Sequence, residues 1–236
     1  MKKYIFNDKL LGSHSFELDD QTFIPTQTSN CIIKASLKVL NQPSKILDLG
    51  CGCGVVAILI AKHSEYEIYL NASDLSDTVV EVVNKNAKEY SMDIDVRKSN
   101  IFDAWEQEKF DLIINDISGV AKEIALISPW FKNISCEAGE GGNLLVNTVI
   151  DNAHKYLNQY GKLIFPVISF SNREAILDKA QEKFKNVELV ERQEWPAPDE
   201  MIKHMSILEK LKNKGLIDYK ISFGKVIGYT EIYCAY

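Results

Sequence analysis

The sequence is poor in arginine and contains no long apolar run. Three of its 236 residues are arginine, and the formal net charge is −6. Arginine is the preferred residue for bidentate contacts to phosphates and bases, so this composition disfavours a nucleic acid as a partner. No run approaches the roughly 20 apolar residues that a membrane helix needs. We therefore expect no membrane association and a cytoplasmic protein.

The sequence also lacks a clustered set of metal ligands. Two of its five cysteines, Cys51 and Cys53, stand one residue apart, but the other three are isolated and the four histidines form no pair. A structural zinc site or a disulfide framework would need a second cluster at a suitable distance. We expect no metal site and interpret both cysteines as small side chains between glycines.

Positive charge gathers in one place, between residues 203 and 225. This stretch contains six lysines against Glu209 and Asp218. The pattern is typical of a solvated helix face, although a basic surface that contacts RNA stays open as an alternative.

Short apolar runs alternate with helical patterns from residue 45 onward. Strands are expected at 45–49, 67–73, 95–97, 110–115, 161–169 and 187–190, and helices at 55–63, 76–90, 143–157 and 172–184. This alternation is the signature of βαβ units on a parallel sheet. The tail departs from the rhythm, with a helix expected at 199–214 and one or two strands within 217–236.

These patterns predict an N-terminal appendage (1–44) that precedes the main domain (45–236). The appendage is expected to hold a hairpin-like stretch to about residue 20 and a helix over 30–40. The main domain is expected to contain an inserted segment at about 196–224. That insertion could shape the choice of substrate or form a homodimer contact, and the sequence leaves both open, together with the oligomeric state.

A glycine loop follows the first strand of the main domain. Gly50, Gly52 and Gly54 alternate, and Asp48 stands two residues ahead of them. A dinucleotide fingerprint would need its third glycine at Val55. A carboxylate beside the loop repels a diphosphate and attracts a cation, so the site suits a nucleoside with a positively charged tail.

At this loop the sequence resembles the class I S-adenosylmethionine-dependent methyltransferases. Asp48-Leu-Gly-Cys-Gly-Cys-Gly54 is similar to their first motif, and Asp74 stands where an acidic residue binds the ribose hydroxyls. Asn100 and Ile101 lie in a segment similar to the one that meets the adenine amino group. The resemblance implies S-adenosylmethionine as the cofactor. It also implies a Rossmann-like, doubly wound α/β fold with a mostly parallel seven-stranded sheet and an antiparallel final strand.

The resemblance further implies a set of cofactor-binding residues in this sequence. They are Ser29, Asp48, Gly50, Cys51, Gly52, Gly54, Asp74, Leu75, Asn100, Ile101 and Asn115. Ser29 belongs to this set because residues 23–29 resemble the proline-containing segment that precedes the first motif in the branch containing the release-factor glutamine methyltransferases.

The acceptor region departs from the pattern of that branch. Where those enzymes have Asn-Pro-Pro-Tyr, this chain reads Asn115-Asp116-Ile117-Ser118. Asn115 matches a residue that accepts hydrogen bonds from the target nitrogen. Asp116 is the local candidate for a general base, with the binding of a cationic acceptor and the capping of a turn as alternatives. Asn115 and Asp116 are the expected catalytic residues.

These observations predict an enzyme that transfers a methyl group to a nitrogen or oxygen atom of a small molecule or a protein side chain. Two alternatives stay open: a methyltransferase for RNA or DNA, and a cofactor-binding module without catalysis. Trp130, Phe131, Trp195 and Phe223 lie in the acceptor half. Trp130 and Phe131 are expected either on a lid over the substrate or as packing residues.

Overall fold

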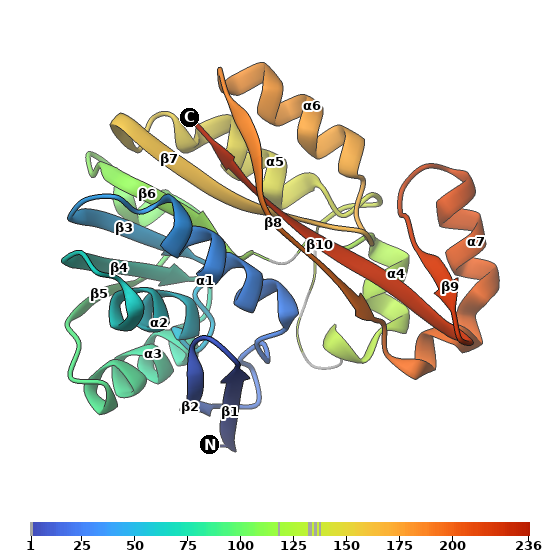
Figure 1. Ribbon diagram of the computed structural model, residues 1–236, viewed down its shortest axis with the longest axis horizontal. Coiled ribbons are helices and arrows are strands. Elements are labelled where there is room, and N and C mark those ends of the chain that lie inside the picture. Colours follow the sequence, from blue (N-terminus) through green and yellow to red (C-terminus); the bar gives the residue numbers. More distant parts are fainter. Residues whose placement is uncertain (1, 118, 132–133, 135, 137) are drawn as a thin grey trace.

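The computed structural model describes residues 2–117, 119–131, 134, 136 and 138–236, and its largest element is a sheet flanked by helices (Figure 1). The strands of this sheet are β3 (Ser44–Leu49), β4 (Ile68–Asp74), β5 (Ile94–Lys98), β6 (Phe110–Asn115), β7 (Leu157–Ile168), β8 (Val187–Pro196), β9 (Lys220–Ser222) and β10 (Lys225–Ala235). Their order is β5-β4-β3-β6-β7-β10-β8, with β9 paired to β10. Neighbours from β5 to β7 are parallel, and β10 is antiparallel to both β7 and β8. The predicted Rossmann-like fold with an antiparallel final strand is confirmed.

The described sheet has eight strands instead of the predicted seven, because β9 forms a hairpin with β10. The chain reverses at Phe223 and Gly224, whose φ angles are +48° and +74°. Two consecutive residues with positive φ are what a tight two-residue hairpin turn needs. One or two strands were expected within 217–236, and the structure forms two, β9 and β10.

Helices cover both faces of the sheet. They are α1 (Gln27–Val39), α2 (Val55–His63), α3 (Asp77–Glu89), α4 (Lys122–Ile127), α5 (Leu144–Ala153), α6 (Arg173–Lys183) and α7 (Met205–Asn213), with the 3-10 helices η1 (Asp103–Trp105), η2 (Pro129–Phe131) and η3 (Asp199–His204). None of the helices in the described residues is long and apolar enough to cross a membrane.

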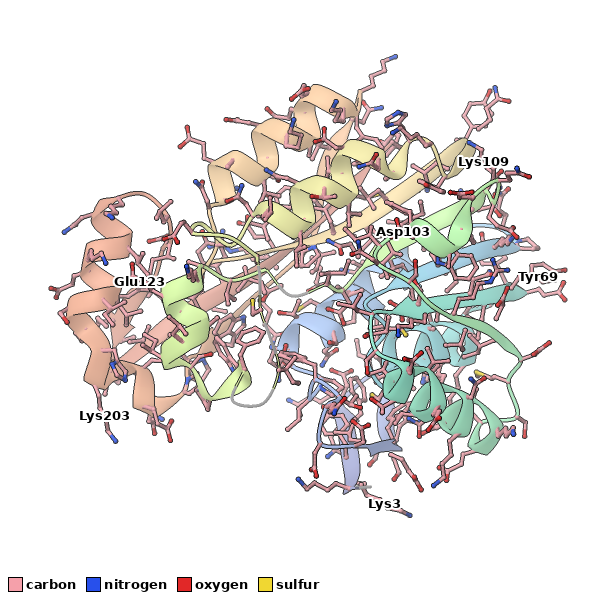
Figure 2. The ribbon with its side chains drawn as sticks, turned by 180° about the vertical axis from the view of Figure 1, so that it is seen from behind. Lys3, Tyr69, Asp103, Lys109, Glu123 and Lys203 are labelled. Carbon is pink, nitrogen blue, oxygen red and sulfur yellow. The ribbon has the colours of Figure 1, made fainter. Side chains whose placement is uncertain are left out.

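Alternate residues of each strand enter two separate cores. Ile46 and Ile114 pack with residues of α1, α2 and α3, whereas Leu47 and Ile113 pack with α5 and α6 on the opposite face. Successive side chains of a strand point to opposite faces, so strands covered on both sides must be apolar throughout. In Figure 2, the view from behind, α5 and α6 lie in front of the sheet.

A third apolar cluster lies beyond the end of the sheet, in a part that we call the C-terminal lobe (α4, η3, α7 and β9). Met201, Leu208 and Leu211 of η3 and α7 pack here against Phe170 and Trp195, which lie at the ends of β7 and β8. Figure 2 labels Glu123 and Lys203 on this lobe, away from the helices that cover the sheet. The helix expected over 199–214 is divided into η3 and α7.

The first strands, β1 (Lys2–Asp8) and β2 (Gly12–Leu18), form a separate antiparallel hairpin. Asn86 of α3 is one of the side chains that hold it to the rest of the fold. Its Oδ1 accepts a hydrogen bond of 2.8 Å from the Glu17 amide, and its Nδ2 donates to the carbonyls of Glu17 (3.0 Å) and Cys53 (2.9 Å). Asn86 is fully buried and joins the hairpin, α3 and the glycine loop.

Replacing Asn86 by alanine is expected to lower the free energy of unfolding by about 2–3 kcal/mol, because three backbone groups lose their partner. Asn84→Ala is the matched control in the same helix. The Asn84 side chain is exposed and bonds only to the Val80 carbonyl, so its loss is expected to stay within about 0.5 kcal/mol. Urea denaturation measures both, and equal losses would contradict the anchoring role of Asn86.

Candidate functional site

The glycine loop turns sharply between β3 and α2. Gly50, Gly52 and Gly54 have φ angles of +74°, +52° and +80°, a region that residues with a Cβ rarely adopt. A Cβ on Gly50 would lie 2.9 Å from Cγ1 and 3.1 Å from the backbone nitrogen of Ile117, so the loop packs directly on the segment after β6. A Cβ on Gly52 would meet nothing closer than the Phe23 carbonyl at 3.9 Å. Space is therefore open above the middle of the loop.

A cavity of about 490 Å³ lies beside this loop, where β3, β4 and β6 end. Of the residues predicted from the sequence, those that line it are Ser29, Gly50, Cys51, Gly52, Asp74, Leu75, Asn100, Ile101 and Asp116. Asp48, Gly54 and Asn115 lie outside the lining. Residues that the sequence reasoning missed include Gln21, Val79 and Ile134, none of which belongs to the segments matched to the family pattern.

Asp74 ends β4 and connects the loop to the cavity wall. Its carboxylate accepts hydrogen bonds from the Gly52 amide (3.2 Å) and the Ser76 amide (3.3 Å). Burial raises the pKa of this carboxyl, while the backbone hydrogen bonds oppose the rise. The carboxylate thus holds the glycine loop from below and keeps one face toward the cavity.

Asp48 lies beneath the loop, with no exposed surface. Its Oδ2 accepts from the Ala57 amide in the first turn of α2 at 3.3 Å, and its Oδ1 has no hydrogen-bond partner among the described residues. Burial raises the pKa of Asp48 well above its usual range, and the nearby Asp116 and Asp74 raise it further. A buried carboxyl oxygen without a partner is costly, and a cation close by would compensate for it.

The segment after β6 brings a third carboxyl to the same place. The Asp116 amide donates to the Leu49 carbonyl (3.0 Å), and its Oδ2 accepts from the Ser29 hydroxyl of α1 (2.9 Å). Burial raises the pKa of Asp116 to about 7. Asn115 is fully buried, with its Oδ1 accepting from the Ile117 amide at 3.2 Å. Ser118, quoted with this motif, lies outside the described residues.

The segment after β5 forms the opposite edge of the cavity. The Ser99 hydroxyl donates to the Ile101 carbonyl (3.0 Å) and accepts from the Ala104 amide (3.0 Å), which holds a tight turn. Ile101 adopts a φ of +54° in that turn. Asn100 is exposed at the cavity edge, where its amide is free to meet a polar ligand group.

The two cysteines of the loop are buried, and burial raises the pKa of the Cys53 thiol to about 12. A thiol with so high a pKa is a poor nucleophile and a poor metal ligand at neutral pH. Both side chains line the cavity as small, neutral groups.

A second cavity of about 260 Å³ adjoins the first. It lies between the N-terminus of α1, the segment after β6, η2 and the end of β8. The two cavities share Phe23, Asp116 and Ile117 in their linings. Trp130, Phe131 and Trp195, noted in the sequence, also line the second one. Thr26, Gln27 and Thr28 belong to the segment 23–29 noted in the sequence, but only Ser29 of that segment was predicted as a site residue.

The chain is similar to known methyltransferases. Residues 29–116 match the family "Methyltransferase small domain". The chain is 28% identical over 174 residues to the ribosomal protein uL3 glutamine methyltransferase of Francisella tularensis, a match that covers 70% of this chain and 55% of that protein. It is 25% identical over 165 residues to the release factor glutamine methyltransferase of Streptococcus pneumoniae, covering 66% and 57%. The chain thus spans somewhat more than half the length of these two relatives.

Among solved structures, the fold is similar to that of a 16S rRNA N2 G1207 methyltransferase from T. thermophilus in complex with AdoMet and guanosine. The TM-score is 0.61 at 14% identity, and the match covers 99% of this chain and 50% of that one. The strand order and this likeness define a Rossmann-like methyltransferase fold. The family match and the two relatives confirm the resemblance to the class I S-adenosylmethionine-dependent methyltransferases seen in the sequence, and S-adenosylmethionine as the cofactor.

Replacing Asp74 by alanine is expected to weaken S-adenosylmethionine binding by about 10- to 100-fold, because charge-assisted hydrogen bonds contribute about 1.5–3 kcal/mol. The matched control is Asp77→Ala in the first turn of α3. The Asp77 carboxylate is 75% exposed and pairs with Lys98, so little change is expected. Isothermal titration of both variants measures the effect, and an unchanged affinity for Asp74→Ala would contradict it.

The affinity for S-adenosylmethionine is also expected to rise with pH up to about 7 and then to level off. Burial holds a proton on Asp116 below its pKa of about 7, and a bound cation favours the ionised carboxylate, so binding releases that proton. The rise is expected to approach tenfold per pH unit at most. Titrations from pH 5.5 to 8.5 measure it.

S-adenosylhomocysteine, whose sulfur is uncharged, provides the control ligand for that pH series, and Asp116→Asn provides the control protein. Both are expected to show a flatter pH dependence, with Asp48 and Asp74 as the remaining carboxyls near the site. Parallel curves for the two ligands would show that Asp116 does not respond to the charge on sulfur.

Proposed function

We propose that this chain is a catalytic methyltransferase, which transfers the methyl group of S-adenosylmethionine to a nitrogen or oxygen atom of a small molecule or protein side chain. The observation that carries the proposal is the shared wall of the two cavities, formed by Phe23, Asp116 and Ile117. A donor in the larger cavity and an acceptor in the smaller one would meet at this wall. Holding two reactants in line accounts for about 7–11 kcal/mol of a barrier, so adjacency is the main requirement.

The larger cavity has groups that suit each part of S-adenosylmethionine. The match between cavity and cofactor depends mainly on the buried carboxyls beside it. Asp48, one oxygen of which lacks a partner among the described residues, would carry a negative charge beneath the loop once the cationic methionine part is bound. Asp74 provides acceptor oxygens for the two ribose hydroxyls. When bound, the cofactor supplies a methyl group on a positively charged sulfur.

The remaining predicted residues take positions around these two carboxyls. The glycine loop (Gly50, Cys51, Gly52) and Ser29 would lie along the methionine part, and Gly54 allows the loop to enter α2. Leu75 would pack on the sugar and base, and Asn100 and Ile101 would hold the adenine. Asn115 supports the site from the interior, because its amide is fully buried.

On the acceptor side we assign different roles to the two predicted catalytic residues. Asp116 lies in both linings, so its carboxyl would contact the acceptor and take up a proton. Asn115 contacts neither cavity, and its Oδ1 is engaged by the Ile117 amide. It is therefore a positioning residue, which holds the turn that presents Asp116.

The names of the two relatives describe methyltransferases that act on glutamine of a ribosomal protein and of release factors. A protein side chain is accordingly one acceptor class for this chain. The buried state of Asn115 gives less support to a glutamine amide in particular, because its side chain does not reach the acceptor cavity.

A nucleic acid acceptor receives less support from the charges. Of the six lysines between residues 203 and 225, four form ion pairs with Glu123, Asp218, Glu194 and Asp199. Lysines already paired with carboxylates offer little net charge to a phosphate backbone. A cofactor-binding module without catalysis is the other alternative.

The test measures S-adenosylhomocysteine release and the transfer of a labelled methyl group to small amines, phenols, a glutamine-containing peptide and an RNA oligonucleotide. Label in a small molecule or the peptide, lost in Asp116→Ala, is the expected result. Phe223→Ala, at the exposed tip of the β9–β10 turn, serves as the control with full activity. Label in RNA alone would contradict the acceptor class, and cofactor binding without any transfer would indicate the non-catalytic module.

A further inference from the structure

The second cavity has a distinctive chemistry, being apolar except at one end. Its lining combines Phe23, Trp130, Phe131 and Trp195 with the prolines at 166, 196 and 198. Among the described residues of this lining, Asp116 is the one charged side chain. A ligand of this cavity must therefore be mostly apolar and compatible with a carboxylate at the boundary with the cofactor cavity.

The aromatic walls are held in fixed orientations. The ring centroids of Phe23 and Phe131 lie 5.4 Å apart, and those of Trp130 and Trp195 lie 5.7 Å apart at an interplanar angle of 81°. The Trp195 Nε1 donates to the Thr230 hydroxyl at 2.9 Å, so its polar edge is already satisfied. The indole offers the cavity a π surface with no unsatisfied donor, and such surfaces attract organic cations.

The N-terminus of α1 explains why the carboxylate of Asp116 lies at the end of the second cavity that borders the cofactor cavity. Thr26, the N-cap, accepts from the Thr28 amide, and the first turn of α1 faces the cavity. The Ser29 hydroxyl in that turn donates to Asp116. The positive end of the helix dipole therefore acts on the carboxylate of this chain. A second anion in the cavity would meet both this carboxylate and the apolar walls.

We propose that the second cavity binds a primary amine on an aromatic or apolar body, as a free small molecule, and presents its nitrogen at Asp116 as the methyl acceptor. The proposal rests on the proposed function and names its substrate class. An ammonium group is attracted both by the aromatic faces and by the carboxylate. An acid is repelled. A neutral amide or alcohol can donate a hydrogen bond to the carboxylate but gains neither the charge attraction nor the cation–π contact.

The proposed step balances as follows. The ammonium group of the acceptor gives one proton to the Asp116 carboxylate and becomes a neutral amine. The nitrogen lone pair then forms a bond to the methyl carbon, and the carbon–sulfur bond breaks with its electron pair remaining on sulfur. The products are S-adenosylhomocysteine, the N-methylammonium form of the acceptor and protonated Asp116. That proton is released to solvent, which restores the carboxylate.

The test uses three probes that share a phenylethyl body: phenethylamine, 2-phenylethanol and 3-phenylpropionate. Each is titrated into the full chain saturated with S-adenosylhomocysteine. The amine is expected to bind at least about tenfold more tightly than the alcohol, since hydrogen bonds to charged groups are worth about 1.5–3 kcal/mol. The acid is expected not to bind. Mass spectrometry with S-adenosylmethionine is expected to detect N-methylphenethylamine.

Three variants distinguish the parts of the proposal. Asp116→Asn is expected to remove the preference for the amine over the alcohol while S-adenosylhomocysteine still binds. Phe131→Leu keeps an apolar wall but removes a π face, and is expected to weaken amine binding by about threefold, in line with a cation–π contribution of about 0.5–1 kcal/mol. Phe223→Leu, with its ring fully exposed outside the cavity, is the matched control and is expected to change nothing.

These experiments distinguish a failure of the proposed function from a failure of the amine proposal. No binding of S-adenosylhomocysteine would overturn the proposed function. Binding of S-adenosylhomocysteine with no preference for phenethylamine, or methylation of 4-ethylphenol in its place, would overturn the amine proposal alone. Methylation of a lysine-containing peptide in preference to phenethylamine would overturn the assignment to a free small molecule.

Discussion

The close contact between the glycine loop and the segment after β6 is the constraint on which the site depends. A single Cβ at Gly50 would lie 2.9 Å from the Ile117 side chain and 3.1 Å from its backbone. The hydrogen bond from the Asp116 amide to the Leu49 carbonyl closes the same junction. Because β3 and β6 are parallel neighbours, both segments leave the sheet at one edge. The two cavities consequently share a wall formed by Phe23, Asp116 and Ile117.

That junction also concentrates negative charge. Asp48, Asp74 and Asp116 come from three adjacent strand ends, and burial raises the pKa of each. Carboxyls in this arrangement destabilise one another and the folded chain when they ionise. A cation in the cavity would relieve this, which connects the cost of assembling the site to its preference for a charged ligand.

Much of the fold was predictable because its strands are covered on both faces. The run Phe110–Asn115 and the helix Val55–His63 were predicted with the bounds that the structure shows, since continuous apolar runs and a glycine before a helix are strong local signals. The strand Val187–Pro196 was predicted six residues too short, ending at residue 190. Its outer half is polar and is held by pairing with β10, a contact distant in sequence.

Site residues that belong to a sequence motif or act through their backbone were predictable. Residues whose orientation depends on tertiary packing were less predictable. Asp74 and the glycine loop line the cavity as expected. The sequence could not show that Asn115 would face inward while Asp116 faces the cavities, because this depends on which neighbour the chain meets after β6. The aromatic cavity is assembled from α1, η2 and β8, whose proximity no local pattern encodes.

The fastening of the β1–β2 hairpin by Asn86 has a consequence for the order in which the chain folds. The amide and carbonyl of Glu17 find their partners 69 residues later in the sequence. The hairpin is made before both helices that it contacts. Asp8 can meet Asn30 and Lys34 as soon as α1 has been made, yet Glu17 has no partner until α3 follows. Contacts so far apart in sequence form late, because a long loop must close first. The Glu17 contacts of the hairpin are therefore expected to form later than its contacts with α1.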